Sequence, residues 1–391
     1  MLLAFGPTFD SSLATFWFWF TCLIALIWLR RHIDLLVGRR DPVLQADEPG
    51  PPANELPMVS MLVAAKDEEA NIERCIQGLL RQDYPGLEVI VINDRSADRT
   101  GPIIDSIHQP NFKPVHIRDL PPGWFGKNNA MHVGVTQATG DWLCFSDADC
   151  VFESPQLVAA AVRFALREKI DLLSVMPRLE TGTFWERVIQ PAAGGIMVFW
   201  FPPPRVNNPR SRTAYANGAF MLMHRRTYDA LGGHEAVKAT LNEDMHFARR
   251  TKQQGLRLRV IRGTHLYHVR MYVGFQQVWR GWSRIFYGCF GSFGRLLASA
   301  VMLSIFSISP YITLIAGLIA GNAAFTGAGA AAVIAQQSVL WQFYPQAGSP
   351  AVWALTYPVG AAIAIGMSLN AMRRLFGQET NWRGTTYTGG S

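Results

Sequence analysis

Two patterns alternate along this chain of 391 residues: long uncharged apolar stretches, and a mixed polar region between them. No Asp, Glu, Lys or Arg occurs in residues 11–29 or in residues 296–372. Because about 17–25 apolar residues can cross a bilayer as a helix, these stretches predict membrane spans and exclude a wholly soluble protein. The predicted order is an external N-terminus (1–12), a transmembrane helix (13–29), a cytoplasmic linker (30–57), a polar α/β domain (58–271), an interfacial helix (272–295), a transmembrane helix (296–320), an external or re-entrant connection (321–348), a transmembrane helix (349–372) and a cytoplasmic tail (373–391).

Arginines beside the apolar stretches set the predicted orientation. None lies in residues 1–12, whereas four follow the first span: Arg30, Arg31, Arg39 and Arg40. The positive-inside rule then places the N-terminus outside and residue 30 onward in the cytoplasm. A cleaved signal peptide is the alternative, but it would carry its positive charge before the apolar run. We therefore predict a multi-pass protein of the cell inner (plasma) membrane, with its polar domain in the cytoplasm.

The end of the chain limits the number of crossings. Arg373 and Arg374 follow the last apolar stretch, which predicts a cytoplasmic end and an even number of crossings after the polar domain. Residues 323–348 are rich in glutamine and glycine, so we interpret them as the external or re-entrant connection. A fourth span there is the alternative, and it would place both arginines outside.

Composition narrows the classes of function. The net charge is +7, and aromatic residues make up 12%, which excludes a disordered chain. The five cysteines form no CxxC pair, so neither a disulfide framework nor a zinc site is predicted. Lys and Arg do not form runs interleaved with aromatic residues, so nucleic acid is not expected as a partner. The arginines beside the apolar stretches suggest anionic lipid headgroups instead.

The polar domain opens with alternating strand and helix patterns. Apolar runs predict strands at 59–65, 87–92 and 141–145, and helical periodicity predicts helices at 68–82 and 97–107. This βαβα order is typical of an α/β domain with a mostly parallel sheet and helices on both faces. Ligands of such sheets bind beyond the carboxyl ends of the strands.

Acidic residues stand at two of these predicted strand ends. Asp147 and Asp149 follow the strand at 141–145, and such a pair can hold a hard divalent cation, Mg²⁺ or Mn²⁺. Asp94 closes the strand at 87–92, where a carboxylate can accept hydrogen bonds from a base or a ribose. A solvated turn for the pair, and a helix cap for Asp94, are the alternatives.

Three further segments carry candidate chemistry. Lys127 follows a glycine-containing turn at a predicted helix start, where it could neighbour a phosphate or simply lie on the surface. Glu243 and Asp244 precede a helical stretch, as a cap or as a general base. The segment Ile196–Pro204 is apolar and aromatic; it is either core or a segment that dips into the bilayer and admits a lipid acceptor.

Together these motifs resemble the membrane-bound branch of glycosyltransferase family 2, which includes ceramide, hopanoid-associated and carotenoid glycosyltransferases. The resemblance covers residues 57–290 and rests on four segments in order: AAKDEEANIERCIQGLLRQDYPGLEVIVINDRSADRT, GKNNAMHVGV, DADC and NED. It implies a GT-A fold, a nucleotide-diphospho-sugar donor (a UDP-sugar foremost), a divalent metal, and inversion at the anomeric carbon.

The resemblance also implies roles for particular residues. Asp244 matches the general base, with Glu243 beside it in the same motif, and Asp149 matches the direct metal ligand with Asp147 as its partner. Residues that would lie near the donor are Ala65, Asp67, Asp94, Lys127, Asp147 and Trp282. Arg280 matches part of a Gln-x-x-Arg-Trp motif that contacts the diphosphate in relatives, although lipid phosphates are an equal alternative.

This chain departs from that last motif, because Trp282 stands one place later than the family pattern requires. The departure, with few spans to form a channel, argues against a processive polysaccharide synthase.

A segment at 380–387 resembles a family tail that returns near the active site. We predict an enzyme that transfers one sugar to a membrane lipid. The alternatives are a polysaccharide synthase and a catalytically silent scaffold that binds nucleotide sugars.

Overall fold

A computed structural model describes residues 12–38, 42–375, 380–382 and 385–387. The chain divides into two compact units. The helical unit contains the described residues up to 38, residues 181–197 and the stretch from 272 to 375. The sheet unit contains residues 42–180 and 198–271, together with two short strands near the C-terminus.

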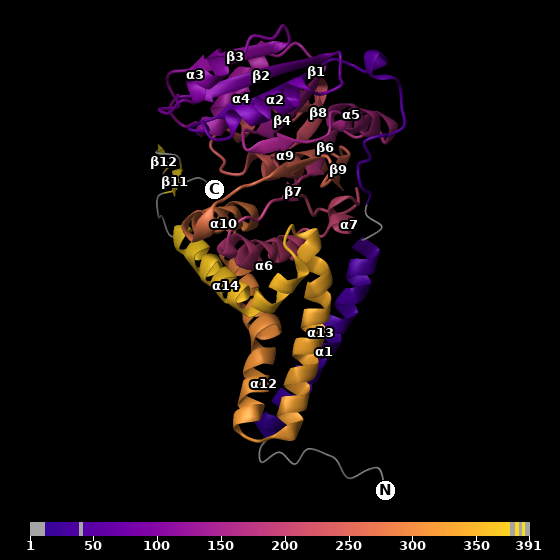
Figure 1. The fold of residues 1–391 in the computed structure, drawn as a ribbon, viewed down its shortest axis with the longest axis vertical. Helices are drawn as coiled ribbons and strands as arrows, with labels where there is room; N and C mark the ends of the chain where they lie inside the picture. The colour runs from indigo at the N-terminus through magenta and orange to yellow at the C-terminus, as the bar shows by residue number, and fades with distance from the viewer. Residues whose placement is uncertain (1–11, 39–41, 376–379, 383–384, 388–391) are drawn as a thin grey trace. The chain divides into compact units, whose positions relative to one another are not determined.

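A seven-stranded sheet forms the centre of the sheet unit (Figure 1). Its strands, in spatial order, are β3 (Phe112–Ile117), β2 (Leu87–Asp94), β1 (Val59–Ala65), β4 (Trp142–Asp147), β8 (Met221–His224), β6 (Leu172–Met176) and β9 (Leu258–Arg262). Only β8 runs antiparallel to its neighbours. The predicted α/β class and mostly parallel sheet are therefore confirmed.

Helices pack against this sheet because the contact buries their apolar faces away from water. Residues Ile72, Cys75, Ile76 and Leu79 repeat at helical spacing and are all buried against the sheet. The helices of the sheet unit are α2 (Ile72–Leu80), α3 (Thr100–Asp105), α4 (Gly126–Gln137), α5 (Leu157–Arg167), α7 (Pro203–Val206), α8 (Arg225–Ala230) and α9 (Glu243–Gln253), with short 3₁₀ turns η1 (Ala53–Glu55) and η2 (His234–Val237). Both predicted helices are present but shorter than the periodicity indicated.

Two small sheets complete the sheet unit. One has the strand order β5 (Cys150–Phe152), β10 (Tyr267–Val269) and β7 (Arg178–Leu179). The other pairs β11 (Thr380–Trp382) with β12 (Thr385–Tyr387) in antiparallel register. This second pair covers most of the segment that resembles the family tail; residues 383–384 lie outside the described residues.

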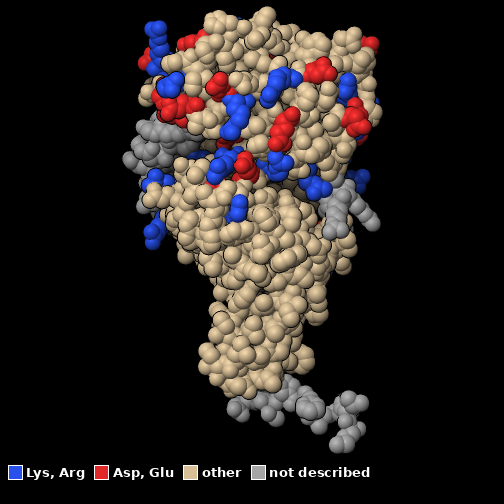
Figure 2. Space-filling view, in the orientation of Figure 1, with Lys and Arg blue, Asp and Glu red and all other residues tan. Residues whose placement is uncertain are grey.

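The helical unit contains the long apolar stretches. Its elements are α1 (Ser12–Gly38), α6 (Phe184–Trp200, whose last turn enters the sheet unit), α10 (Gly274–Phe290), α11 (Phe293–Met302), the π-helical turn η3 (Leu303–Ile308), α12 (Ser309–Ile319), α13 (Ala323–Gln346), the 3₁₀ turn η4 (Ala351–Thr356) and α14 (Tyr357–Arg374). Figure 2 shows no charged side chains over α12 and α13, whose sequences contain none, whereas the face of the sheet unit that it shows carries many.

Four helical stretches of the described chain are long and apolar enough to cross a membrane: Ser12–Leu36, Phe293–Ile319, Ala323–Gln346 and Ala351–Arg374. The third is one continuous helix, α13, where we predicted an external or re-entrant connection. It packs along both α12 and α1 as a long hairpin (Figure 1). A helix of 24 residues is about 36 Å long, so α13 is long enough to span a bilayer core.

The start of α14 lies halfway along the rod that α11, η3 and α12 form. The hydroxyl groups of Tyr357 and Ser307 share a hydrogen bond of 2.8 Å. Gln336, in the middle of α13, donates to the Ser307 carbonyl at 3.3 Å. From that level α14 packs against α11 and α10 (Figure 1). Residues 347–374 therefore enter the helix bundle to half its depth and return.

Candidate functional site

The centre of the site is a partly buried ion bridge at the carboxyl ends of the strands. The Lys127 ammonium, at the start of α4, lies 2.7 Å from Asp147 Oδ1 and 2.7 Å from Glu243 Oε1. Asp147 ends β4, and Glu243 begins α9. Residues from three separate sequence motifs thus meet at one cation. Their meeting places the DAD, GKNNA and NED motifs in a single cluster.

Asp244 lies beside this bridge and is held by the backbone. Its Oδ2 accepts a hydrogen bond from the Gly218 amide at 3.1 Å, and its Oδ1 accepts from the Met245 amide at 2.7 Å. Burial and the neighbouring Glu243 carboxylate raise the pKa of Asp244 to about 7, against the opposing effect of Lys127. A carboxylate with a pKa near 7 is suited to general base catalysis at neutral pH.

Lys127 is correspondingly fixed in its charged form. Burial alone would lower the pKa of its ammonium, but the carboxylates of Asp147 and Glu243 outweigh burial and raise that pKa well above its usual value. Two carboxylates already neutralise this cation, so an anionic diphosphate would need further positive charge, such as that of a metal ion, at the same site.

Gly218 is a site residue that the sequence analysis missed. A Cβ atom built there would lie 3.2 Å from Lys127 Nζ and 3.6 Å from both Asp244 Oδ2 and Glu243 Oε1. The missing side chain therefore leaves room beside the three charged groups. The available signal was the Asn217-Gly218 pair before the apolar run of β8, a typical turn dipeptide.

Asn128 is a second residue that the sequence analysis missed. It follows Lys127 on α4 and is 1% exposed. Its side-chain amide donates to three backbone carbonyls, those of Val237 at 2.7 Å, Lys238 at 3.3 Å and Thr240 at 2.9 Å. These carbonyls precede the NED segment, so Asn128 ties the start of α9 to the helix that carries Lys127.

The predicted nucleoside side of the site lies at the ends of β1 and β2. These strands are neighbours, and β4 adjoins β1 on its other side, so Asp94 and Asp147 end strands that are about 10 Å apart. Ala65 ends β1 opposite Asn93. Both carboxylate oxygens of Asp94 are bound by Arg95, through Nε at 2.8 Å and Nη2 at 3.1 Å. This pairing was not predicted from the sequence.

The loops after β1 and β2 brace each other. Asp67 Oδ1 accepts from the Ala97 amide at 2.8 Å, and the Ser96 hydroxyl accepts from the Asp67 amide at 3.0 Å. Asp67 and Arg95 both have left-handed backbone conformations, with φ of 53° and 54°. Non-glycine residues in this region are strained and concentrate at functional sites. Asp67 therefore shapes the neighbouring loop, and its place at the donor stays a prediction.

The predicted metal pair occupies the tip of β4. Asp147 faces the ion bridge, and Asp149 lies two residues beyond, before β5. Among the described residues, no group of three or more His, Cys, Asp or Glu side chains is arranged to hold a metal ion. A pair of carboxylates fits a cation that takes its remaining ligands from a bound diphosphate and water.

Helix α10 carries the remaining predicted residues. Arg280 is exposed, whereas Trp282 is buried in the interior of the helical unit, 5.7 Å from the Phe286 ring. The two side chains therefore do not share one surface of α10. The roles of Arg280 at a diphosphate and of Trp282 at the donor stay predictions.

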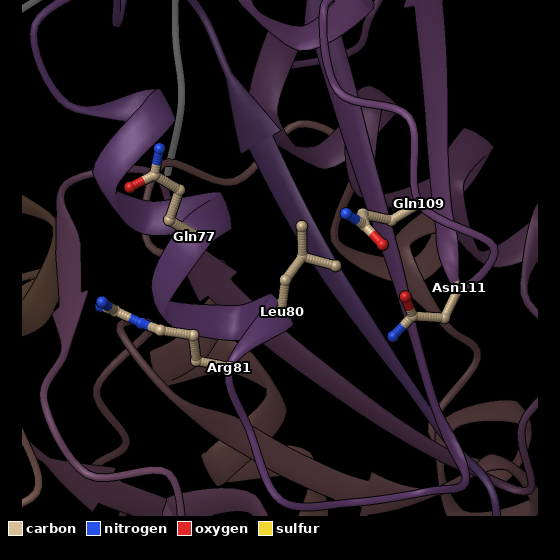
Figure 3. Close-up of a pocket in the computed structure, with 5 residues that line it drawn as sticks. All are labelled: Gln77, Leu80, Arg81, Gln109 and Asn111. Carbon is tan, nitrogen blue, oxygen red and sulfur yellow. The ribbon is translucent and has the colours of Figure 1, made fainter.

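A surface cavity of about 380 Å³ lies at the opposite end of the sheet (Figure 3). Its lining comes from the end of α2 and from the loop before β3: Gln77, Leu80, Arg81, Gln109 and Asn111. None of the predicted site residues lines it. In an α/β sheet this is the edge away from the ligand-binding ends of the strands, so the cavity does not change the location of the site.

Comparison with known proteins shows which family this chain is similar to. The family model described as Glycosyl transferase family 2 matches residues 60–232. Among curated proteins, 4,4'-diaponeurosporenoate glycosyltransferase of Staphylococcus aureus (strain MRSA252) is 28% identical over 265 residues, which cover 66% of this chain and 68% of that protein. The corresponding protein of strain USA300 is 27% identical over 265 residues, which cover the same shares of the two chains.

A solved structure supports the fold. It is the mannosyltransferase PcManGT from Pyrobaculum calidifontis, in complex with GDP-Man and Mn²⁺. The likeness has a TM-score of 0.54 at 18% identity, and it covers 90% of this chain and 99% of the other. The GT-A fold expected from the sequence is confirmed.

Proposed function

Because this chain is a glycosyltransferase with a family 2 domain at residues 60–232, we propose that it transfers one sugar from a nucleotide-diphospho-sugar to a membrane lipid, with inversion. The observation that carries the proposal is the cluster of Lys127, Asp147, Glu243 and Asp244 at the carboxyl edge of the sheet. It combines a fixed cation, an acidic pair and a carboxylate of raised pKa.

The reaction follows from these groups. An acceptor hydroxyl attacks the anomeric carbon, Asp244 takes the hydroxyl proton, and the bond from the anomeric carbon to the diphosphate breaks with its electron pair on the leaving oxygen. One displacement with one base inverts the anomeric centre, and no carboxylate nucleophile is needed, unlike in a retaining mechanism. Lys127 places positive charge where the leaving diphosphate gains negative charge.

Asp149 and Asp147 would hold Mg²⁺ or Mn²⁺, which neutralises charge on the diphosphate when it is bound. On the nucleoside side, Asp94 would receive the base or ribose, with Ala65 and Asp67 forming the adjacent wall. We favour a UDP-sugar as donor and a GDP-sugar as the next choice. The lipid acceptor is proposed from the apolar helices of this chain and from the curated relatives, whose name gives a carotenoid acid as their acceptor.

We propose three membrane crossings, by α1, by the α11–α12 rod and by α13. The support is the position of Tyr357 at half depth, which makes residues 347–374 a re-entrant segment. Arg373 and Arg374 then stay on the cytoplasmic side of an inner membrane, as the positive-inside rule requires. The proposal moves the re-entrant feature that we predicted at 321–348 to the next segment of the chain.

A donor screen in native-like lipid tests the proposed activity. The full chain is supplied with UDP- or GDP-sugars, Mg²⁺ or Mn²⁺, and a total lipid extract, and products are followed by mass spectrometry. We expect a single-hexose mass increase on a lipid that disappears with EDTA and in Asp244→Asn. A polymeric product would support a synthase, and donor binding without transfer to any lipid or to water would support the silent scaffold.

A further inference from the structure

One stretch of the chain contains arginines but no acidic residue. Between Glu186 and Asp229 there is no Asp or Glu, whereas there are six arginines: Arg187, Arg205, Arg210, Arg212, Arg225 and Arg226. Three of these, Arg205, Arg210 and Arg212, lie on the surface of the sheet unit and are exposed. Local charge of one sign on a surface indicates a partner of opposite charge.

Exposed apolar side chains precede these arginines directly. Val198 is 48% exposed and Phe199 is 39% exposed, although both are large and apolar. They lie in the last turn of α6, where the chain leaves the helical unit. We call residues 198–212 the basic platform. Its sequence, apolar residues followed by arginines, is the composition of protein surfaces that lie at a membrane interface.

The basic platform is fixed to the sheet unit by hydrogen bonds. The Asn207 amide group donates to the Val260 carbonyl at 2.9 Å and accepts from the Val260 amide at 2.7 Å, in the way that another strand would pair with β9. Lys252 donates to the carbonyls of Asn208 at 2.6 Å and Ser211 at 3.3 Å. The exposed arginines therefore lie on a loop whose backbone is held in place by hydrogen bonds to the sheet unit.

Packing also fixes the apolar end. Phe201 is buried, and its ring stacks on Tyr215 with centroids 5.6 Å apart. Phe199 lies two residues earlier and stays exposed. The loop thus holds Phe201 inward and leaves Val198 and Phe199 exposed, a few residues before three exposed arginines in the chain. A surface of this kind matches a bilayer interface, where apolar side chains enter the headgroup region and arginines meet lipid phosphates.

We infer that the basic platform binds the surface of a bilayer that contains anionic phospholipids, with Val198 and Phe199 inserted at headgroup depth. The inference rests on the proposed function only in placing the chain at a membrane. Each arginine near an anionic surface contributes about 1 kcal/mol, which is about fivefold in affinity. The platform would hold the sheet unit at the membrane surface, where a lipid acceptor is found.

A fluorescent label at Phe199 tests the contact without measuring catalysis. The full chain, as Phe199→Cys in a Cys22→Ser background, is labelled with an environment-sensitive dye; the other four cysteines are buried. It is placed in nanodiscs of phosphatidylcholine alone or mixed with phosphatidylglycerol. We expect blue-shifted emission and quenching by spin-labelled lipid, both severalfold stronger with phosphatidylglycerol.

Two variants that lose the same number of positive charges show whether the arginines of the basic platform cause the difference between the lipid mixtures. Arg205→Gln, Arg210→Gln and Arg212→Gln together should abolish the difference between the two lipid mixtures. Arg74→Gln, Arg81→Gln and Lys113→Gln remove the same charge from another part of the sheet unit and should leave it intact. Nucleoside diphosphate binding, measured in parallel, reports on folding and on the donor site of every variant.

The inference is overturned if the label stays in water in both lipid mixtures, which would point to an acidic protein or no partner at all. Equal quenching in neutral and anionic nanodiscs would also overturn it, because the arginines would then be irrelevant. Loss of the signal in both triple variants would overturn it too, since net charge alone would be responsible. None of these results depends on sugar transfer, so failure of the proposed function is seen separately.

Discussion

The two units of this protein accommodate buried polar groups in different ways. In the sheet unit, full charges are brought together, as where Lys127 joins Asp147 and Glu243. In the helical unit, residues 296–372 contain no charged side chain, and several hydroxyl groups bond the carbonyl one turn earlier in their own helix. Thr313 bonds Ser309 at 3.0 Å, and Ser368 bonds Ala364 at 3.0 Å.

This difference shows which polar groups carry function. A hydroxyl satisfied within its own helix costs little and needs no partner from another element. A buried charge costs several kcal/mol unless a partner from elsewhere compensates it. The sheet unit bears that cost at the carboxyl end of the strands, which is where chemistry is expected. Substitutions should therefore affect catalysis in one unit and packing in the other.

The largest expected effect is at the proposed base. Asp244→Asn keeps the shape of the side chain but removes its ability to take a proton. Transfer should fall by about 10²–10⁴-fold, the range typical of general acid–base catalysis. Donor affinity, measured by calorimetry with the nucleoside diphosphate, should change little. A loss of transfer below tenfold would assign the base to another residue.

Asn128→Ala should have the next largest effect, because the hydrogen bonds from this buried amide to three backbone carbonyls are lost. We expect the free energy of unfolding to fall by about 1–3 kcal/mol. We also expect a lower kcat, because α9 and Asp244 shift. Asn111→Ala is the matched control, since Asn111 makes one bond, to the Leu87 carbonyl at 3.2 Å, at the other end of the sheet. If kcat is unchanged while stability falls, Asn128 has a structural role only.

In the helical unit, two glycines of α13 give a sharp comparison of packing. A Cβ at Gly329 would lie 2.5 Å from the Leu314 amide nitrogen, whereas a Cβ at Gly327 would meet nothing within 4 Å. Gly329→Ala should destabilise the α12–α13 hairpin by about 1–3 kcal/mol. Gly327→Ala should be neutral or stabilising, because alanine favours helices. Thermal unfolding in nanodiscs measures both, and equal unfolding temperatures would contradict the close approach.

The smallest expected effect is a shift in pH dependence. Activity requires ionised Asp244, so kcat/KM should rise with pH through about 7. Glu243→Gln removes the adjacent negative charge that helps raise this pKa, and the rise should move to lower pH. Glu235→Gln, an exposed residue paired with Lys238, should leave the profile in place. A shift to higher pH in Glu243→Gln would mean that Glu243 does not raise the pKa of Asp244.

Local patterns in the sequence determined much of this molecule. Apolar periodicity located β1, β2 and β4, because residues on a buried strand must be apolar whatever lies beside them. The order of strands and helices determined the α/β class, and the carboxyl ends of the strands determined where Asp94 and Asp147 had to lie. The absence of charge in the long apolar stretches likewise determined which segments could meet lipid.

Only the tertiary structure decided which distant residues meet. Lys127 and Glu243 are far apart in the chain, and no local pattern encodes their bridge, which depends on how α4 and α9 pack at one sheet edge. The same holds for Gly218 and Asn128, whose importance lies in neighbours that the sequence does not reveal. The course of residues 323–374 was also decided this way. Hydropathy measures whether a segment tolerates lipid, whereas hydrogen bonds such as that of Tyr357 with Ser307 fix the depth at which it lies.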